Sequence, residues 1–369
     1  MISVFGSKVG KEEIEGVAAV LESQWMGFGK KVTEFEEKFA ARRGHENFAM
    51  VDSGSNALYL AVTLLDLPPG SDVIVPAFTW VSCAQAVILA GHKPVFCDVE
   101  VDTLNVTRET VEAAMTPNTR AVMVVHFAGK PVDLDPIIEL GLPIIEDAAH
   151  AVDSYYKDKP CGGLGDVGIY SFDAVKNLTT GEGGGIVTRD KQKIDRAKIL
   201  RYCGIGKSGF EAAASSAGDK TRWWEYNIQE PFIKMLPTNI AAAIGLAQLE
   251  KIDDLQAYRK EVWDTYQKEF ADVEWITRPP EAESYERHSY FTYVIRVPDR
   301  DKLAKYLFDA DIYTTLRYHP LHLNPLYKSD AKLPNSEILN EDSLSLPLHP
   351  NLSMEQVEYI VDKVKTFSI

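Results

Sequence analysis

The sequence predicts an α/β protein in which a mostly parallel sheet is covered by helices on both faces. Its central part alternates short apolar runs rich in Val and Ile with segments of helical spacing, as in parallel sheets buried on both sides. Of the 369 residues, 45% are hydrophobic and 25% are charged, which is the balance of a globular protein with a substantial core. The length predicts two domains, or one large domain with an appendage.

The N-terminal part predicts alternating helices and strands. Val17 and Val20 share a face of the first helix, Phe35 and Phe39 share a face of the second, and Ser53 stands before the third. Helical spacing predicts helices over residues 10–24, 33–41, 55–65, 84–90 and 134–140. Apolar runs predict strands over residues 72–75, 94–98, 121–127, 143–146, 166–172 and 184–188.

The C-terminal part has a different pattern. Residues 241–267 show long, charged helical spacing, followed by a predicted strand over residues 289–296 and a predicted helix over residues 299–310. We therefore expect a large domain of residues 1–250 and a smaller α+β domain of residues 251–369, with the boundary near Lys251. Residues 211–218, which contain Ala and Ser, are expected to form a mobile loop.

Charge and cysteine content exclude several classes of protein. The net charge of −15 argues against a non-specific nucleic-acid binder, and no apolar run approaches the roughly 20 residues that span a bilayer. The first residues lack the features of a signal peptide. The cysteines are scattered, which argues against a disulfide framework or a metal site and favours a reducing cytoplasm. They are Cys83, Cys97, Cys161 and Cys203.

Candidate functional residues follow the predicted strands. Ligands of parallel α/β sheets bind beyond the carboxyl ends of the strands, where Asp147, Ser171 and Lys176 are expected to lie, with Ser55 and Trp80 nearby. Each also has a structural interpretation. Asp147 and Ser55 would help to cap helices. Lys176 would be solvated, and Trp80 would belong to the core.

Together these residue types suit pyridoxal 5'-phosphate. This cofactor needs a lysine that bonds to its aldehyde, a carboxylate beside its ring nitrogen, an aromatic plane against its ring, and hydroxyl and N–H donors for its phosphate. Burial and nearby positive charge lower the pKa of a lysine towards neutrality, which suits this role. Composition alone does not identify the cofactor, whereas the order of the motifs does.

The motifs resemble a known family over nearly the whole chain. The sequence is similar to the sugar-nucleotide aminotransferases of the DegT/DnrJ/EryC1/StrS group, which have the aspartate-aminotransferase fold. The most specific match is S-F-x-x-x-K-x-(L/I)-T-T-G-E-G-G, which begins at Ser171. Weaker matches lie in residues 25–36, 52–58, 75–80, 146–151 and 241–249.

The resemblance implies a role for individual residues of the cofactor site. Lys176 would bond covalently to the cofactor, and Asp147 would pair with its ring nitrogen. His150 would lie near the ring hydroxyl and Trp80 would stack on the ring. Ser171, with Ser55 and the backbone of Asn56, would hold the phosphate.

The resemblance is less specific for the substrate pocket and the subunit contact. Tyr318 and His319 match the part of the family that lines the sugar pocket, although a His in a Pro-rich turn is usually structural. Relatives carry an Asn before the Ala-rich helix that reaches the neighbouring subunit's phosphate. Here an ungapped count puts Lys234 at that position, whereas Asn227 fits only with an insertion. Relatives often have Gln at the position of Lys130.

The implied enzyme is an aminotransferase in deoxyamino-sugar biosynthesis, for a cell-surface polysaccharide or an antibiotic sugar. It would take an amino group from a donor, glutamate in most relatives, and pass it to a nucleotide-linked keto-sugar, working as a homodimer with shared active sites. Lys30, Lys31 and Arg317 are candidates to bind the nucleotide diphosphate.

Two alternatives remain open. A sugar dehydratase of the same family would carry His in place of Lys176, and a non-catalytic regulatory protein would not need to keep lysine, aspartate and serine together. A nucleotide-hydrolysing site is excluded, because the glycines at residues 181–185 are not followed by the Lys-Ser/Thr of a P-loop.

Overall fold

The computed structural model describes residues 1–206, 224 and 226–368. The predicted mobile loop at residues 211–218 lies outside the described residues.

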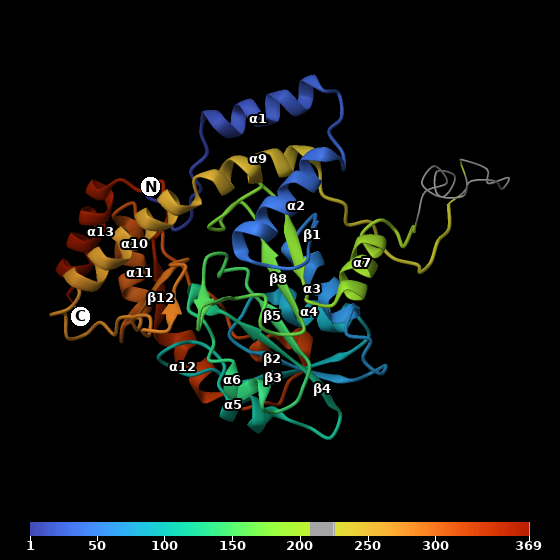
Figure 1. Ribbon diagram of the computed structural model, residues 1–369. Coiled ribbons are helices and arrows are strands. Elements are labelled where there is room, and N and C mark those ends of the chain that lie inside the picture. The colour runs from blue at the N-terminus through green and yellow to red at the C-terminus, as the bar shows by residue number, and fades with distance from the viewer. Residues whose placement is uncertain (207–223, 225, 369) are drawn as a thin grey trace.

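A seven-stranded sheet forms the centre of the molecule (Figure 1), in the order β1-β9-β8-β5-β4-β2-β3. The five neighbouring strands from β8 to β3 pair in parallel, whereas β9 runs antiparallel to both β8 and β1. The strands are β1 (Phe48–Val51), β2 (Asp72–Pro76), β3 (Lys93–Cys97), β4 (Thr119–Val125), β5 (Ile144–Asp147), β8 (Val167–Ser171) and β9 (Gly184–Val187).

Helices cover both faces of this sheet because alternate strand residues point to opposite sides. Val73 and Val75 of β2 join the core under α3 and α4, whereas Ile74 joins the core formed with α5 and α6. At the β1 end, Phe48 and Met50 pack with α2 and α9, and α1 lies across α9 in Figure 1. These helices are α1 (Lys11–Glu22), α2 (Lys30–Arg43), α3 (Gly54–Thr63), α4 (Val81–Leu89), α5 (Arg108–Ala114), α6 (Asp135–Ile138), α7 (Lys191–Leu200) and α9 (Asn239–Glu250).

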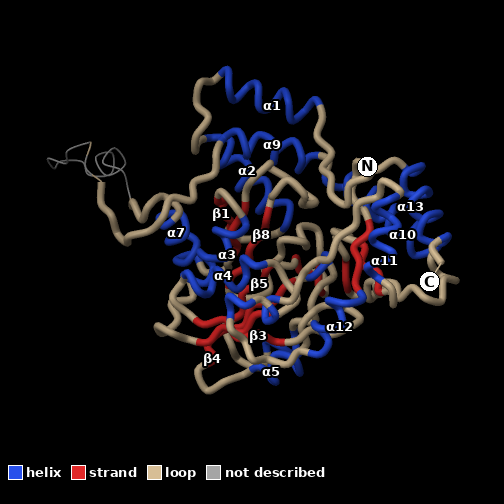
Figure 2. Tube along the Cα trace, turned by 180° about the vertical axis from the view of Figure 1, so that it is seen from behind, coloured by secondary structure: helices blue, strands red, loops and turns tan. Residues whose placement is uncertain are grey.

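A second hydrophobic core lies beside the main sheet in the C-terminal part (Figure 2). Trp263 and Tyr266 are fully buried at its centre, and the first residues of the chain join it through a bridge between Ile2 and Ile312. Its elements are α10 (Ile252–Glu269), α11 (Arg300–Asp309), α13 (Met354–Thr366) and the antiparallel pair β11 (Tyr293–Arg296) and β12 (Ser343–Leu346).

Residues 317–342 return from this second core to the main sheet. The N–H of Leu321 donates to the carbonyl of Ala77, just beyond β2. Asp98 accepts from the backbone N–H groups of Asn335 and Ser336 at the start of α12 (Pro334–Asp342). These bonds hold both the early and the late part of the segment at the carboxyl ends of β2 and β3. Between them lie the 3₁₀ turns η2 (Leu321–Leu323) and η3 (Pro325–Tyr327).

Some elements of the structure differ from the sequence predictions or add to them. The helical pattern over residues 241–267 is two helices that meet at Lys251, which is the C-cap of α9 and the N-cap of α10. The strand predicted over residues 289–296 begins only at Tyr293, because the backbone of Ser289 and Phe291 bonds to the η1 turn (Phe127–Gly129). A three-stranded sheet of β6 (Tyr155–Tyr156), β7 (Lys159–Pro160) and β10 (Glu286–Arg287) was not predicted.

Two further features bear on the sequence predictions. Within the described ranges, no helix is long and apolar enough to cross a membrane. The four cysteines are free, and three of them are buried.

Candidate active site

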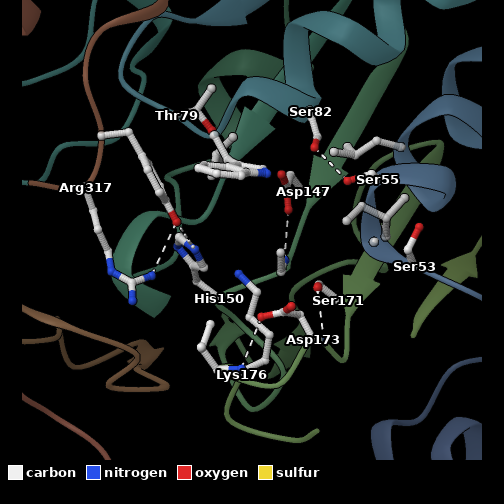
Figure 3. Close-up of a pocket in the computed structure, with 18 of the residues that line it drawn as sticks. Ser53, Ser55, Thr79, Ser82, Asp147, His150, Ser171, Asp173, Lys176 and Arg317 are labelled. Atoms are coloured by element: carbon white, nitrogen blue, oxygen red, sulfur yellow. Dashed lines mark hydrogen bonds between the residues drawn. The ribbon is translucent and has the colours of Figure 1, made fainter. Parts of the chain in front are cut away.

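A cavity of about 360 Å³ opens at the carboxyl ends of the main strands. Val125 of β4, Asp147 of β5 and Ser171 of β8 line it at the strand ends. Figure 3 shows Lys176 and Asp147 in its middle, Ser53 and Ser55 on one side and Arg317 on the other.

One side of the cavity is suited to a phosphate. The N-terminus of α3 faces it, and helix N-termini attract anions through their free N–H groups and dipole. Ser53, Ser55, Ser82 and Ser171 line this side, and the hydroxyls of Ser55 and Ser82 lie 2.7 Å apart. A Cβ on Gly54 would come within 2.7 Å of the Cβ of Ser171, so only glycine allows this close approach.

Asp147 ends β5 and is buried at the cavity wall. Its Oδ1 accepts from the N–H of Ala149 at 2.9 Å, and its Oδ2 accepts from the thiol of Cys83 at 3.2 Å. Burial and the adjacent carboxylate raise the pKa of Cys83 well above its usual value, so the thiol stays protonated and donates. The carboxylate is thus fixed by two donors, and no helix begins behind it for it to cap.

Lys176 lies in the loop between β8 and β9, and its Nζ is 4.8 Å from the centroid of the Phe291 ring. Burial, together with the positive charge of Arg317, lowers the pKa of Lys176 from 10.5 to about 8. A substantial share of the amine is therefore neutral and nucleophilic near physiological pH.

His150 has one ring nitrogen free to bind a ligand. Its ring stacks on Phe291 at 4.0 Å, and its Nε2 lies 3.2 Å from the hydroxyl of Tyr318. Burial and the charges of Lys176 and Arg317 hold the pKa of His150 well below 6.5, so the ring is neutral. Because Nη1 of Arg317 donates to the Tyr318 oxygen, that hydroxyl is free to donate to Nε2. The ring proton then sits on Nδ1, which is buried without a partner.

Trp80 is available for stacking because it is not part of the core. It precedes α4, 53% of its surface is exposed, and it lines the cavity. Its ring centroid lies 5.4 Å from that of Tyr318.

Most of the predicted residues come together at the cavity from distant parts of the sequence. Those that line it are Ser55, Trp80, Asp147, His150, Ser171, Lys176 and Tyr318.

The other predicted residues lie elsewhere. The N–H of Asn56 donates to the Ser53 side chain and its amide donates to Asp52, so the Asn56 backbone is already engaged. His319 is exposed and bonds to Asn340 instead of facing the cavity. Asn227 and Lys234 are exposed on a segment that pairs with residues 202–206, outside the cavity lining.

Of the three candidates for the diphosphate, only Arg317 lines the cavity. Lys31 pairs with Glu34 on α2, and Lys30 is exposed on the same helix.

The cavity fits pyridoxal phosphate by its own donors. The hydroxyls around the α3 N-terminus suit the phosphate, the fixed carboxylate of Asp147 suits a protonated ring nitrogen, and the unpartnered Nδ1–H of His150 suits a ring oxygen. Lys176 supplies the amine that the aldehyde requires.

Sequence reasoning missed Cys83, Phe5 and Phe291 and gave no role to Thr79 or Ser82. Thr79 and Ser82 lie within two residues of Trp80 at the start of α4. Their closeness in sequence to a predicted site residue could have identified them as candidates. Phe5 and Phe291 carried no such signal, because both reach the site from remote segments.

Comparison with known proteins decides the family. A model of the DegT/DnrJ/EryC1/StrS aminotransferase family matches residues 7–365. The chain belongs to this family. The predicted family and the predicted aminotransferase class are therefore confirmed.

One relative of this aminotransferase is named for a sugar substrate, and another is a solved aminotransferase. It is 37% identical to a dTDP-4-dehydro-2,3,6-trideoxy-D-glucose 4-aminotransferase of Saccharopolyspora spinosa, over 98% of this chain and 96% of the relative. It is 36% identical to the solved aminotransferase TlmJ from Streptoalloteichus hindustanus, with a TM-score of 0.92, covering 99% of this chain and 98% of that one. This match confirms the predicted fold class.

A third relative bears on the cofactor. The sugar aminotransferase Spr1654 of Streptococcus pneumoniae, described as putative, has been solved in PMP and PLP forms. The PMP form is 29% identical, with a TM-score of 0.90 and coverage of 98% of both chains. These forms agree with the predicted cofactor.

Proposed function

We propose that this aminotransferase uses pyridoxal 5'-phosphate to move an amino group from glutamate to a nucleotide-linked keto-sugar. The observation that carries the proposal is that Lys176, with its lowered pKa, and Asp147, fixed by two donors, line one cavity.

Each residue of the site has a separate role in the proposed reaction. When bound, the cofactor supplies a carbon that accepts amines and a ring that delocalises negative charge. Lys176 holds the cofactor and then, once a substrate amine has displaced it, carries a proton to and from the reacting carbon. Asp147 keeps a proton on the ring nitrogen, the serines and the α3 N-terminus bind the phosphate, and Trp80 covers the ring.

The two alternatives receive no support from the site. Lys176 stands where a dehydratase of this family has His, and its neutral amine is suited to catalysis. A regulatory protein would not require a lysine of lowered pKa beside a fixed carboxylate.

The acceptor is a keto-sugar attached to a nucleotide. The relative in Saccharopolyspora spinosa is named for a dTDP-linked 4-keto sugar, and Tyr318 in the cavity lining offers a ring face against which sugar carbons pack. A biosynthetic enzyme of this kind works in the cytoplasm, where its free cysteines stay reduced.

The active enzyme is a homodimer with shared sites. Residues 226–235 pair with residues 202–206 to form an arm at the side of α7 (Figure 1). Tyr226, Ile228 and Ile233 are each more than half exposed on this one arm, and such a group of apolar side chains is suited to a protein interface. Asn227 and Lys234 lie on the same arm, outside the lining of their own cavity, which leaves either residue available to contact the phosphate of the partner's cofactor.

Two half-reactions test the proposal separately. The yellow holoenzyme should lose its colour on incubation with L-glutamate and release 2-oxoglutarate. The resulting amine form should then add nitrogen to a member of a panel of nucleotide-linked 3-keto and 4-keto sugars, detected by mass spectrometry. Failure with glutamate and with every other amino donor would refute transamination, whereas failure with every sugar would refute only the acceptor class.

A further inference from the structure

Arg317 is a buried cation that has no anionic partner among the described residues. Four arginines in the described part of the chain are buried. Arg43 pairs with Asp153, Arg201 pairs with Glu36, and Arg259 donates to three backbone carbonyls. Within the described ranges, Arg317 has one acceptor, the Tyr318 hydroxyl at 3.4 Å, and its Nε is buried with no partner there. An uncompensated buried charge is costly, so an unpaired guanidinium that lines a cavity points to an anionic ligand.

Two aromatic rings contact the planar guanidinium of Arg317. Its Cζ lies 4.3 Å from the ring centroid of Phe5 and 4.6 Å from that of Phe291. Aromatic rings next to the guanidinium carbon favour contact with its faces and leave the N–H groups of its edge for hydrogen bonds. Such an edge matches a planar carboxylate through two parallel hydrogen bonds.

Arg317 lies near Lys176, the residue whose amine the amino donor would displace. Lys176 and Arg317 contact the same Phe291 ring, with Nζ at 4.8 Å and Cζ at 4.6 Å from its centroid. Figure 3 shows Arg317 on the opposite side of Lys176 from Ser53 and Ser55, so it does not serve the proposed phosphate position.

We propose that Arg317 binds the α-carboxylate of the amino donor. This inference rests on the proposed transamination. A donor amine that displaces Lys176 takes the place of its Nζ, and the α-carboxylate of an amino acid is one carbon away from that amine. A buried guanidinium that contacts two aromatic rings fits this small planar anion better than a flexible diphosphate that must remain linked to a nucleoside.

Two matched ligands test the proposal by binding, without turnover. One is 2-methylglutamate, which has no α-hydrogen to lose, and the other is 4-amino-4-methylpentanoate, in which a methyl group replaces the α-carboxylate. Their dissociation constants would be measured on the holoenzyme by calorimetry. Wild type should prefer 2-methylglutamate by roughly 10- to 150-fold, as expected for a hydrogen-bonded charged pair. Arg317→Gln should abolish most of that preference. Arg317→Lys should keep only part of it, because an ammonium group cannot donate the two parallel hydrogen bonds of a guanidinium.

Controls separate a binding role from a structural one. Arg300→Gln removes a guanidinium that donates to the carbonyls of Asn340 and Ser343 outside the cavity, and it should leave the preference intact. Arg317→Gln should not lower the melting temperature, because it removes an unpaired buried charge. Nucleoside diphosphate affinity, probed with TDP, should stay unchanged in Arg317→Gln.

Two results would overturn the proposal. An unchanged preference for 2-methylglutamate in Arg317→Gln would show that the guanidinium does not bind the α-carboxylate. A loss of TDP affinity with that preference retained would assign Arg317 to the nucleotide. If wild type prefers 2-methylglutamate through Arg317 yet no amino acid is transaminated, the proposed function fails while the carboxylate site stands.

Discussion

The reactivity of Lys176 and Asp147 depends on neighbouring residues from other segments of the chain. Arg317 and burial set the pKa of the lysine, and Cys83 and the N–H of Ala149 fix the carboxylate. The character of each reactive group therefore follows from contacts between segments far apart in the sequence.

The pH dependence of cofactor capture reports the state of Lys176. Only the neutral amine attacks an aldehyde, so the rate at which the cofactor-free chain captures pyridoxal phosphate should rise through pH 8 and level off above it. Arg317→Gln should move this rise to higher pH, because it removes a nearby positive charge. Stopped-flow absorbance measures the rate. A wild-type rate that still climbs tenfold per pH unit beyond pH 9 would contradict the lowered pKa.

Cys83 offers a spectroscopic test of how Asp147 is held. The infrared S–H stretching band of a thiol that donates to a carboxylate lies at lower frequency than that of a free thiol. We expect one such band in the ligand-free chain, absent in Cys83→Ser and shifted upward in Asp147→Asn, where the acceptor becomes neutral. Cys97→Ser, which alters a thiol outside the cavity lining, is the control and should leave the band in place. A band unaffected by Asp147→Asn would show that the thiol does not donate to this carboxylate.

Single residues were predictable where a motif fixed their neighbours in sequence. Lys176, Asp147 and Ser171 lie at or just beyond strand ends, so their shared position followed from the parallel topology. The contacts of Cys83 and Phe291 were not predictable, because they depend on how α4 and the second core pack against β5 and the Lys176 loop. For His319 the motif was misleading. The residue follows Tyr318 of the cavity in sequence, but its side chain bonds to Asn340 of α12.

At the level of elements, the start of α3 is the structure that positions the phosphate side of the cavity. Gly54 permits its close approach to Ser171 at the end of β8. The helix begins where Ser53 caps it, with its side chain accepting from the N–H of Asn56.

Gly54→Ala tests this approach. The new Cβ would clash with the backbone-linked Cβ of Ser171, so α3 must shift, and we expect the affinity for pyridoxal phosphate to fall by roughly 10- to 100-fold. Gly27→Ala is the matched control, because a Cβ there meets no atom within 4 Å, and it should leave the affinity unchanged. Fluorescence titration of the ligand-free chains measures both. Equal affinities of the two variants would mean that the α3 N-terminus does not bind the phosphate.

Elements with a strong local pattern were predicted, and those defined by pairing were not. Strands β2, β4, β5 and β8 are buried apolar runs and were identified by composition. The antiparallel direction of β9 depends on which strands it joins, which periodicity does not reveal. The strand β12 was missed because its small and apolar residues, S-L-S-L, give a short pattern that is resolved only by pairing with β11.

At the level of the whole molecule, the N-terminal residues and a C-terminal segment meet at the cavity. The bridge from Ile2 to Ile312 and the return of residues 317–342 bring Phe5, Arg317 and Tyr318 to the same opening. These contacts join segments separated by hundreds of residues, which is why a prediction of separate N- and C-terminal regions did not include them.

The arm of residues 226–235 gives a prediction about assembly. Sedimentation equilibrium should find twice the 41.1 kDa of one chain. Ile228→Asp combined with Ile233→Asp should shift the chain towards monomers and weaken cofactor binding, because charge replaces exposed apolar contacts and the partner's phosphate contact is lost. Ile338→Asp, at an exposed position on α12, should change neither property. A double variant that stays dimeric would exclude the arm as the subunit contact.

Covalent capture of the cofactor by Lys176 tests the account most directly. Borohydride reduction of the yellow holoenzyme, followed by proteolysis and mass spectrometry, should place the reduced cofactor on the peptide that contains Lys176, and Lys176→Ala should yield no adduct. An adduct on another lysine of the wild-type chain, or none at all on a protein reconstituted with pyridoxal phosphate, would contradict the account.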